Sequence, residues 1–229
     1  MGSTLRVIIL SILLSCAGGY LYLQVQNPWV RKAMLETADR MGELAGAPNQ
    51  VAGWPPAVNK PFPNVALIDH NGTPFDLDSL KGKPTLIEIV AMSCAGCQAY
   101  SGGNRVGGYG GFPSQPDLQS IDEYFSRFTG GLDLHSNKIN FVQIIIYNLK
   151  LEPAGPAELA AWRKHFQFDR SANTAVLSGG KALANQASFN MIPGFILLDK
   201  DLVVRFDATG HNPRHNLYTE LLPAVRRMM

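Results

Sequence analysis

Two cysteines in the sequence Cys94-Ala95-Gly96-Cys97 constrain the fold of this chain more than any other feature. They directly follow an apolar run, 85–91, whose length and β-branched content predict a buried strand. The motif is expected to open a helix, where terminal amides and the helix dipole favour a thiolate and lower the pKa of the first thiol. Because the thiolate is the form that attacks a disulfide, this arrangement predicts thiol–disulfide exchange.

Composition excludes several other classes of protein. The net charge of +2 and the lack of a basic run with interleaved aromatics argue against nucleic-acid binding. Three cysteines are too few for a disulfide-stapled miniprotein. A zinc site would usually show a second cysteine pair, and a haem attachment site would have His where Gln98 stands. We therefore expect no cofactor.

The first 25 residues are expected to decide the compartment. Arg6 precedes an uncharged apolar run, 7–23, at the short end of the roughly 17–25 residues that span a membrane. Three interpretations stay open: an uncleaved signal anchor, a lipoprotein signal cleaved before Cys16, and an ordinary cleaved signal. All three export residues 26–229 to a place where disulfides form, whereas a buried helix of a soluble protein would not. We expect a single-pass protein of a bacterial-type inner membrane, with its catalytic domain on the periplasmic side.

The remaining chain divides into a connecting segment and one domain. Residues 26–62 are expected to hold an amphipathic helix, 28–45, and a semi-extended proline-rich linker. The domain, 63–229, alternates strand and helix patterns, which predicts an α/β fold with a mixed sheet. The expected strands are 65–69 and 74–77 around an Asn-Gly turn, 84–91, 139–149, 174–177, 195–198 and 202–206. The expected helices are 120–128, 156–168, 181–187 and a final helix capped by Asn212 with Pro213 in its first turn.

Three separate pieces of sequence resemble one known family. They are the strand that leads into Cys94, the acid Glu88 six residues before it, and Met191-Ile192-Pro193 followed by a strand. Over about 62–227 the chain resembles the thioredoxin-like superfamily, and most closely its membrane-anchored TlpA/ResA-like thiol–disulfide oxidoreductases. The resemblance implies a thioredoxin-like fold, with a mixed central sheet flanked by helices and an N-terminal membrane helix before it.

The resemblance also implies roles for these residues. Cys94 would attack the substrate disulfide, Cys97 would resolve the mixed disulfide, and Glu88, if buried, would accept the proton of Cys97. Pro193 would be cis and lie beside Cys94, in a loop that pairs with an extended substrate chain. The implied substrate-binding residues are Ala95, Gly96, Ile192 and Gly210. The implied partners are protein thiol or disulfide substrates and a second redox protein that recycles the pair.

Two alternatives and one segment stay open at this level. A Sco-like copper protein would use Cys94, Cys97 and a histidine, for which His211 is the candidate, although Sco proteins place their histidine near 189–193, where this chain has none. A catalytically silent interaction module is the other alternative. The glycine-rich segment 102–111 fits a mobile cover, an anion-binding nest or a plain surface loop.

Overall fold

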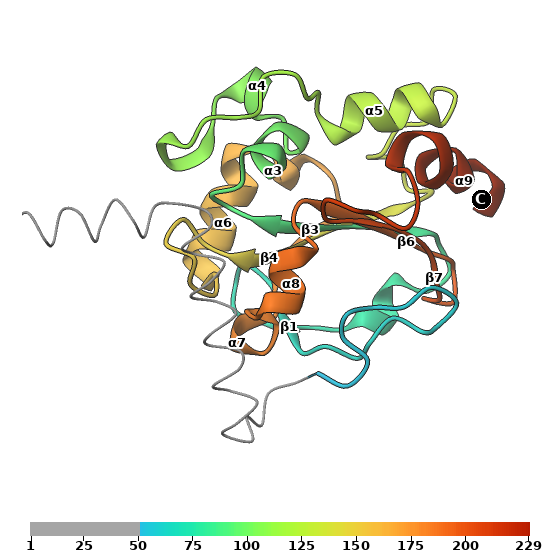
Figure 1. Cartoon of the computed structure of the whole chain (residues 1–229), viewed down its shortest axis with the longest axis horizontal. Coiled ribbons are helices and arrows are strands. Elements are labelled where there is room, and N and C mark those ends of the chain that lie inside the picture. Colours follow the sequence, from blue (N-terminus) through green and yellow to red (C-terminus); the bar gives the residue numbers. More distant parts are fainter. Residues whose placement is uncertain (1–50) are drawn as a thin grey trace, which may run out of the picture. The chain divides into compact units, whose positions relative to one another are not determined.

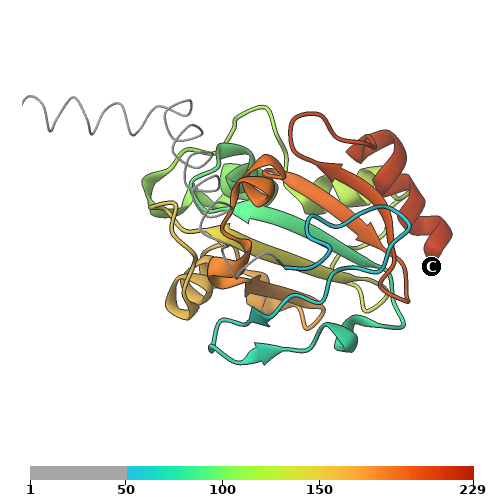
Figure 2. The ribbon, with the colours of Figure 1, turned by 60° about the horizontal axis from the view of Figure 1, so that its bottom comes forward.

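The structure, a computed structural model, describes residues 51–229. They form a mixed seven-stranded sheet in the order β2-β1-β5-β4-β3-β6-β7, with helices on both faces (Figures 1 and 2). The strands are β1 (Leu67–Ile68), β2 (Pro74–Phe75), β3 (Thr85–Ala91), β4 (Asn140–Tyr147), β5 (Thr174–Ser178), β6 (Gly194–Leu198) and β7 (Val204–Thr209). The α-helices are α3 (Ala95–Tyr100), α4 (Gly103–Val106), α5 (Ile121–Phe128), α6 (Pro156–His165), α7 (Gly180–Leu183), α8 (Gln186–Asn190) and α9 (Leu222–Met228). Short 3-10 turns are η1 (Leu77–Leu80), η2 (Tyr109–Gly111) and η3 (Phe168–Arg170), and a π-helical turn, η4 (Leu217–Leu221), precedes α9.

The two central strands are buried along their whole length. Strand β3 runs parallel to β4, and β4 runs parallel to β5, while β6 and β7 complete this side of the sheet in antiparallel order. Every residue of β3 and β4 is buried, because parallel neighbours need crossover segments that cover the sheet. In Figure 1, α3, α5 and α9 lie over one face and α7 and α8 lie over the other.

This arrangement confirms the fold class expected from the sequence. Three parallel strands are followed by an antiparallel pair, and the helix after β3 begins at the cysteine motif. The predicted hairpin around Asn71-Gly72 forms as the short pair β1 and β2. The domain therefore has a thioredoxin-like fold, with β1 and β2 added along the edge strand β5.

The domain begins earlier in the chain than residue 63. The indole Nε1 of Trp54 donates to Ser188 Oγ at 2.9 Å, and the amide of Phe62 donates to Leu202 O at 2.8 Å. Pro61 also forms a β-bridge with Val203. Residues 51–62, which the sequence assigns to a linker, are thus a segment of turns and irregular structure held against the domain.

Two helical expectations need correction. The expected helix 181–187 is divided into α7 and α8, because the side chain of Asn185 accepts from Ser188 N at 3.0 Å and starts a new helix. The final helical segment begins at Leu217 and not after Asn212. Asn216 is its N-cap, since its Oδ1 accepts from the amides of the two residues that follow Leu217, Tyr218 and Thr219.

Within residues 51–229, no helix combines the length and apolar character that crossing a membrane requires. The expected membrane span 7–23 and amphipathic helix 28–45 lie outside the described residues.

Candidate active site

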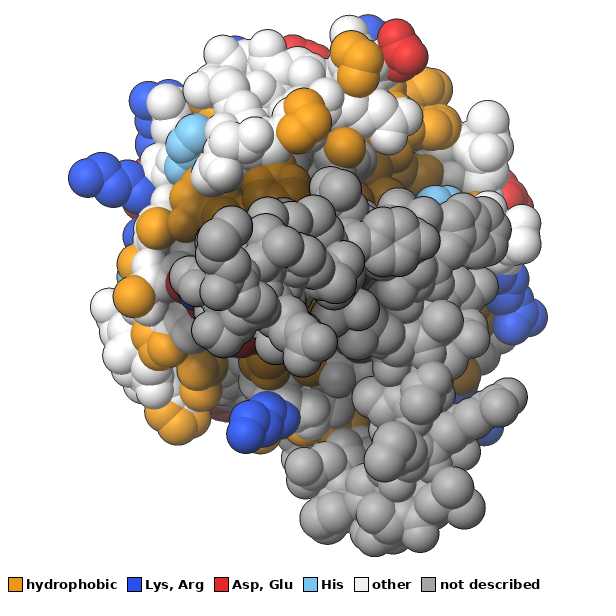
Figure 3. Space-filling model, turned by 60° about the vertical axis from the view of Figure 1, so that its left-hand side comes forward, with side chains coloured by type: hydrophobic (Ala, Val, Ile, Leu, Met, Phe, Trp, Pro, Cys, Tyr) orange, Lys and Arg blue, Asp and Glu red, His pale blue; other side chains and the backbone are white. Residues whose placement is uncertain are grey.

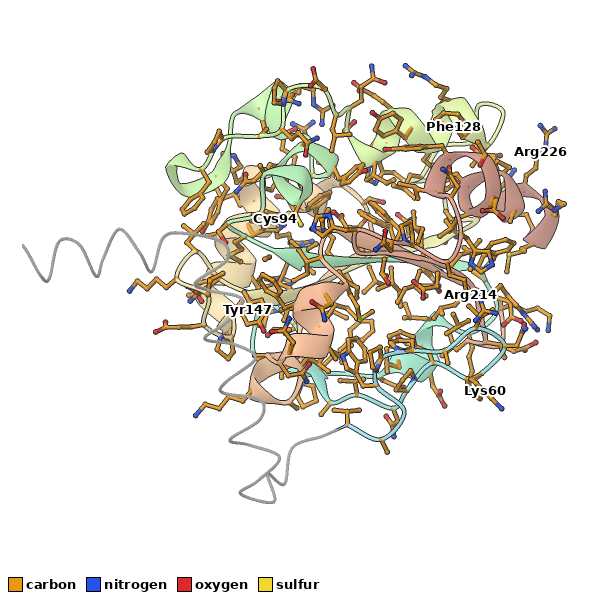
Figure 4. All side chains as sticks on the ribbon, viewed as in Figure 1. Lys60, Cys94, Phe128, Tyr147, Arg214 and Arg226 are labelled. Atoms are coloured by element: carbon orange, nitrogen blue, oxygen red, sulfur yellow. The ribbon has the colours of Figure 1, made fainter. Side chains whose placement is uncertain are left out.

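The two cysteines of the motif differ in exposure and in position. Cys94 is the N-cap of α3 and is partly exposed, whereas Cys97 lies one turn further along and is fully buried. Both thiols are free, and the amide of Cys97 donates to Cys94 Sγ at 3.2 Å. Figure 4 places Cys94 at the start of α3, above the sheet. An incoming disulfide therefore meets Cys94 first.

Hydrogen bonding and burial separate the acidities of the two thiols. The hydrogen bond from the Cys97 thiol lowers the pKa of Cys94, and the amides of Cys97 and Gly96 lower it further, against the opposing effect of burial. Burial raises the pKa of Cys97 well above its usual range, and its bond to Cys94 adds to this. Cys94 thus has the character of a nucleophilic thiolate, and Cys97 that of a thiol that must lose its proton before it reacts.

Glu88 is buried beneath the pair, as the sequence predicts. Its side chain is fully enclosed, and its neighbours across the sheet are Gln143 on β4 and Phe195 on β6. Burial raises the pKa of Glu88 to about 8, while a hydrogen bond from Gln143 opposes that rise. Its Oε1 atom has no hydrogen-bond partner in the described part of the chain. A buried carboxyl with this pKa can accept a proton near neutral pH and release it again.

A polar residue that the sequence analysis did not single out holds Glu88. Gln143 Nε2 donates to Glu88 Oε2 at 2.7 Å and to Ser101 Oγ at 2.9 Å, and Gln143 Oε1 accepts from Trp162 Nε1 at 2.9 Å. A signal was present, because Gln143 interrupts the apolar run 139–149. Its significance depends on the strand register that sets Gln143 directly beside Glu88.

The loop directly before β6, which carries Ile192 and Pro193, lies beside the cysteine pair. The Ile192–Pro193 bond is cis, as the resemblance implied. A Cβ at Gly96 would lie 3.2 Å from Pro193 Cγ and 3.8 Å from Cys94 Sγ, so the proline ring borders the motif directly. Gly210 fixes the loop, because its amide donates to Met191 O at 3.0 Å and to Pro193 O at 3.1 Å. At Gly210 φ is +70°, and a Cβ there would meet Asn190 O, so the position requires glycine.

The expected substrate-binding residues lie around this loop, but they differ in exposure. Ala95 is exposed at the start of α3, whereas Gly96 and Ile192 are buried between the motif and the loop. The amide of Ile192 donates to Phe189 O at 3.2 Å. A substrate chain that used this amide for strand pairing would first have to displace Phe189 O.

The glycine-rich segment 102–111, which we call the cap, is held against the rest of the domain by hydrogen bonds and ring contacts. It contains α4 and η2, and Gln98, which is fully buried, accepts from the amide of Tyr109 at 2.7 Å. The ring of Tyr109 packs edge-on against Trp162 and His165, with centroids 5.4 and 5.5 Å away. His165 Nε2 also contacts Gly107 O at 2.8 Å. These contacts tie the cap to α3 and α6.

His211 does not join the two cysteines. It is exposed after β7, and within residues 51–229 no three His, Cys, Asp or Glu side chains cluster in a way that would hold a metal ion. The alternative metal site of Cys94, Cys97 and His211 is therefore not formed, because the turn that carries His211 leaves its side chain in solvent.

No protein-family model and no curated protein sequence matches the chain. Solved structures overlap it at low identity. A protein of Aquifex aeolicus proposed to transfer electrons is 15% identical over 76% of this chain and 99% of its own, with a TM-score of 0.48. A secreted disulfide oxidoreductase of Mycobacterium tuberculosis, homologous to DsbE of E. coli, is 17% identical over 72% of this chain and 95% of its own, with a TM-score of 0.41. ScoI of Bradyrhizobium japonicum, solved with copper bound, is 20% identical over 76% of this chain and all of its own, also with a TM-score of 0.41. Similarities this low carry no argument about activity, and the fold assignment rests on the strand order and the position of the cysteine pair.

Proposed function

We propose that this chain is a thiol–disulfide oxidoreductase that exchanges disulfides with protein substrates through Cys94 and Cys97. The observation that supports this most is the division between the two thiols: one is partly exposed with a lowered pKa, and the other is buried with a raised pKa. On the face shown in Figure 3, the described side chains that remain visible are a mixture of hydrophobic and uncharged types, with Lys and Arg toward the margin.

In the first step, the Cys94 thiolate attacks one sulfur of a substrate disulfide. The substrate S–S bond breaks, a bond between Cys94 Sγ and that substrate sulfur forms, and the other substrate sulfur leaves as a thiolate that takes a proton from water. The product is a mixed disulfide. Pro193, whose ring borders the motif, lines the approach of the substrate chain.

In the second step, the Glu88 carboxylate takes the proton of Cys97. The Cys97 thiolate then attacks Cys94 Sγ, the mixed disulfide breaks, and the second substrate sulfur leaves as a thiolate. The substrate has gained two electrons, and Cys94 and Cys97 are joined in a disulfide. A dithiol protein in the same compartment would return the pair to its reduced form, and the same steps run in reverse would oxidise a substrate.

Residues 7–23 complete the proposal. We infer that this uncharged apolar run, preceded by Arg6, tethers the domain to a bacterial-type inner membrane with residues 26–229 on the periplasmic side. Substrate disulfides are formed and maintained in that compartment.

Reduction of insulin by the full-length chain in detergent, with a dithiol as electron source, tests the activity. The wild type should accelerate insulin precipitation, Cys94→Ser should abolish the effect, and Cys16→Ser, which changes the cysteine outside the motif, should retain it. A wild type that does not accelerate the reaction, or a Cys94→Ser variant that matches it, would contradict the proposal. The reduction potential of the Cys94–Cys97 couple then indicates whether the chain reduces or oxidises its substrates.

A further inference from the structure

Four polar side chains from four segments meet inside the domain. Glu88 lies on β3, Gln143 on β4, Ser101 directly after α3, and Trp162 on α6. All four are buried, and Glu88, Gln143 and Trp162 are fully enclosed. The hydrogen bonds that join them are 2.7 to 2.9 Å long. Such a network in an apolar interior fixes the side chains that it connects.

Trp162 determines which way the amide of Gln143 points. An indole N–H can only donate, so the atom of Gln143 that faces it must be the carbonyl oxygen Oε1. The amide NH₂ is then turned toward Glu88 Oε2 and Ser101 Oγ. A flipped amide would set two donors against each other at Trp162 and an oxygen against the Glu88 carboxylate.

We infer that Gln143 is a positioning residue for Glu88, held in one orientation by Trp162 so that Glu88 Oε2 accepts an N–H and proton exchange is confined to Oε1. This inference rests on the proposed role of Glu88 as proton acceptor for Cys97. The Oε1 atom is the carboxyl oxygen without a hydrogen-bond partner among residues 51–229. A donor directed at Oε2 stabilises the carboxylate and offers the neutral acid no acceptor.

The other groups around Glu88 raise its pKa or are uncharged. The ionisable groups that interact electrostatically with Glu88 are Cys94 at the N-cap of α3, Cys97 and Tyr100 in α3, and Asp122 on α5. Burial and the negative charges of Cys94 and Asp122 raise the pKa of Glu88, and in the described part of the chain Gln143 is the group that lowers it. Gln143 therefore holds the pKa of Glu88 low enough for part of this carboxyl group to be ionised near neutral pH.

The ¹³C resonance of the Glu88 carboxyl in the full-length chain, titrated from pH 5 to 10, tests this role. Glu88→Gln identifies the resonance by its loss. The wild-type midpoint should lie near 8. In Gln143→Leu it should rise by about one to two pH units, the amount expected when a hydrogen bond to a charged group is lost. In Trp162→Phe it should also rise, because the freed amide can turn and accept the proton of the neutral acid, but by less, because the amide can still donate to the carboxylate.

Asn140→Leu is the matched control. Asn140 is another buried amide of β4, but its Nδ2 donates to Leu80 O and Thr85 Oγ1 and not to Glu88. This variant should leave the Glu88 midpoint within a few tenths of a pH unit. An unchanged midpoint in folded Gln143→Leu overturns the inference. Should Gln143→Leu not fold, an unchanged midpoint in Trp162→Phe overturns it equally.

The carboxyl titration does not depend on enzymatic turnover. A chain that fails to reduce insulin contradicts the proposed function, whereas the Glu88 midpoints of the variants still decide the role of Gln143. If Gln143→Leu shifts the midpoint, the pH profile of mixed-disulfide resolution should shift to higher pH by a similar amount. A fall in stability without either shift would leave Gln143 a structural residue only and overturn the inference.

Discussion

Gly96 and Pro193 lie so close that a Cβ on the glycine would stand 3.2 Å from Pro193 Cγ. The same Cβ would be 3.6 Å from Gln115 Oε1 and 3.8 Å from Cys94 Sγ. Gly96 therefore borders the path by which a substrate would reach Cys94 Sγ.

We expect Gly96→Ala to reduce kcat/KM for disulfide reduction by about tenfold, because the methyl group displaces the proline ring and narrows the approach to Cys94. The free energy of unfolding should change by less than about 1 kcal/mol, since alanine favours the helix and offsets the tight contact. Gly155→Ala is the control. Its Cβ would make only an ordinary contact with Glu158, 3.8 Å away, and its activity should match the wild type. Full activity in Gly96→Ala would show that the loop accommodates the methyl group.

Cys97→Ser should accumulate mixed disulfides with substrate proteins, while Cys94→Ser should not. The reason is that Cys94 is partly exposed with a lowered pKa, and Cys97 is buried with a raised pKa. Non-reducing gel electrophoresis followed by mass spectrometry of the trapped species measures this. Equal trapping by both variants would show that the roles of the two cysteines are wrongly assigned.

Glu88→Gln keeps the shape of the side chain and removes the proton acceptor. Resolution of the mixed disulfide by Cys97 should slow by about 100-fold at pH 8 to 9, a typical loss for a general base. The difference should shrink below pH 7, where Glu88, with a pKa of about 8, is mostly protonated in the wild type. Stopped-flow kinetics separates this step from the first attack, which should change far less. Glu123→Gln, an exposed acid on α5, is the control. Identical resolution rates in Glu88→Gln and the wild type from pH 6 to 9 would exclude the proposed role.

The same substitution should alter how stability depends on pH. The pKa of Glu88 rises from 4.5 to about 8 on folding, so between these values the folded state binds more protons than the unfolded state. The contribution of Glu88 to stability is therefore present below pH 4.5 and is lost as the pH rises toward 8. Glu88→Gln removes this loss and should be more stable than the wild type at pH 9 by several kcal/mol, but not at pH 5. Urea denaturation of both proteins at the two pH values measures the difference. If the free energies of unfolding of Glu88→Gln and the wild type differ by the same amount at pH 5 and at pH 9, the raised pKa of Glu88 is contradicted.

A reporter enzyme that works only in the cytoplasm, fused after residue 229, should be inactive in bacteria. The proposed span 7–23 would carry the C-terminal end of the chain across the membrane. Leu14→Arg places a charge in that span and should restore reporter activity by blocking insertion. An active reporter on the unaltered chain would overturn the proposed location.

Local patterns were sufficient for the parts of the site that lie close together in the chain. The apolar run 85–91 predicted β3, and the motif that follows predicted a thiol pair at the start of a helix. The resemblance to the thioredoxin-like superfamily, carried by the spacing of Glu88 from Cys94 and by the strand that follows Pro193, pointed to those two residues. The start of the last helical segment does not follow from the sequence, because Asn212 and Asn216 both suit an N-cap; Asn216 takes that position, and its side chain accepts from the amide of Tyr218.

The sequence by itself determined the α/β class and the place of the cysteine pair between a strand and a helix, because strand periodicity and short-range spacing are properties of neighbouring residues, and the family resemblance pointed to Glu88. Only the tertiary structure decided that Gln143 stands beside Glu88, that Trp162 orients it, and that Gln98 pins the cap at Tyr109. Glu88 and Gln143 are 55 residues apart, and only the register of β3 on β4 brings them together. The role of a buried polar side chain depends on its hydrogen-bond partner, and packing between distant segments determines which residue that partner is.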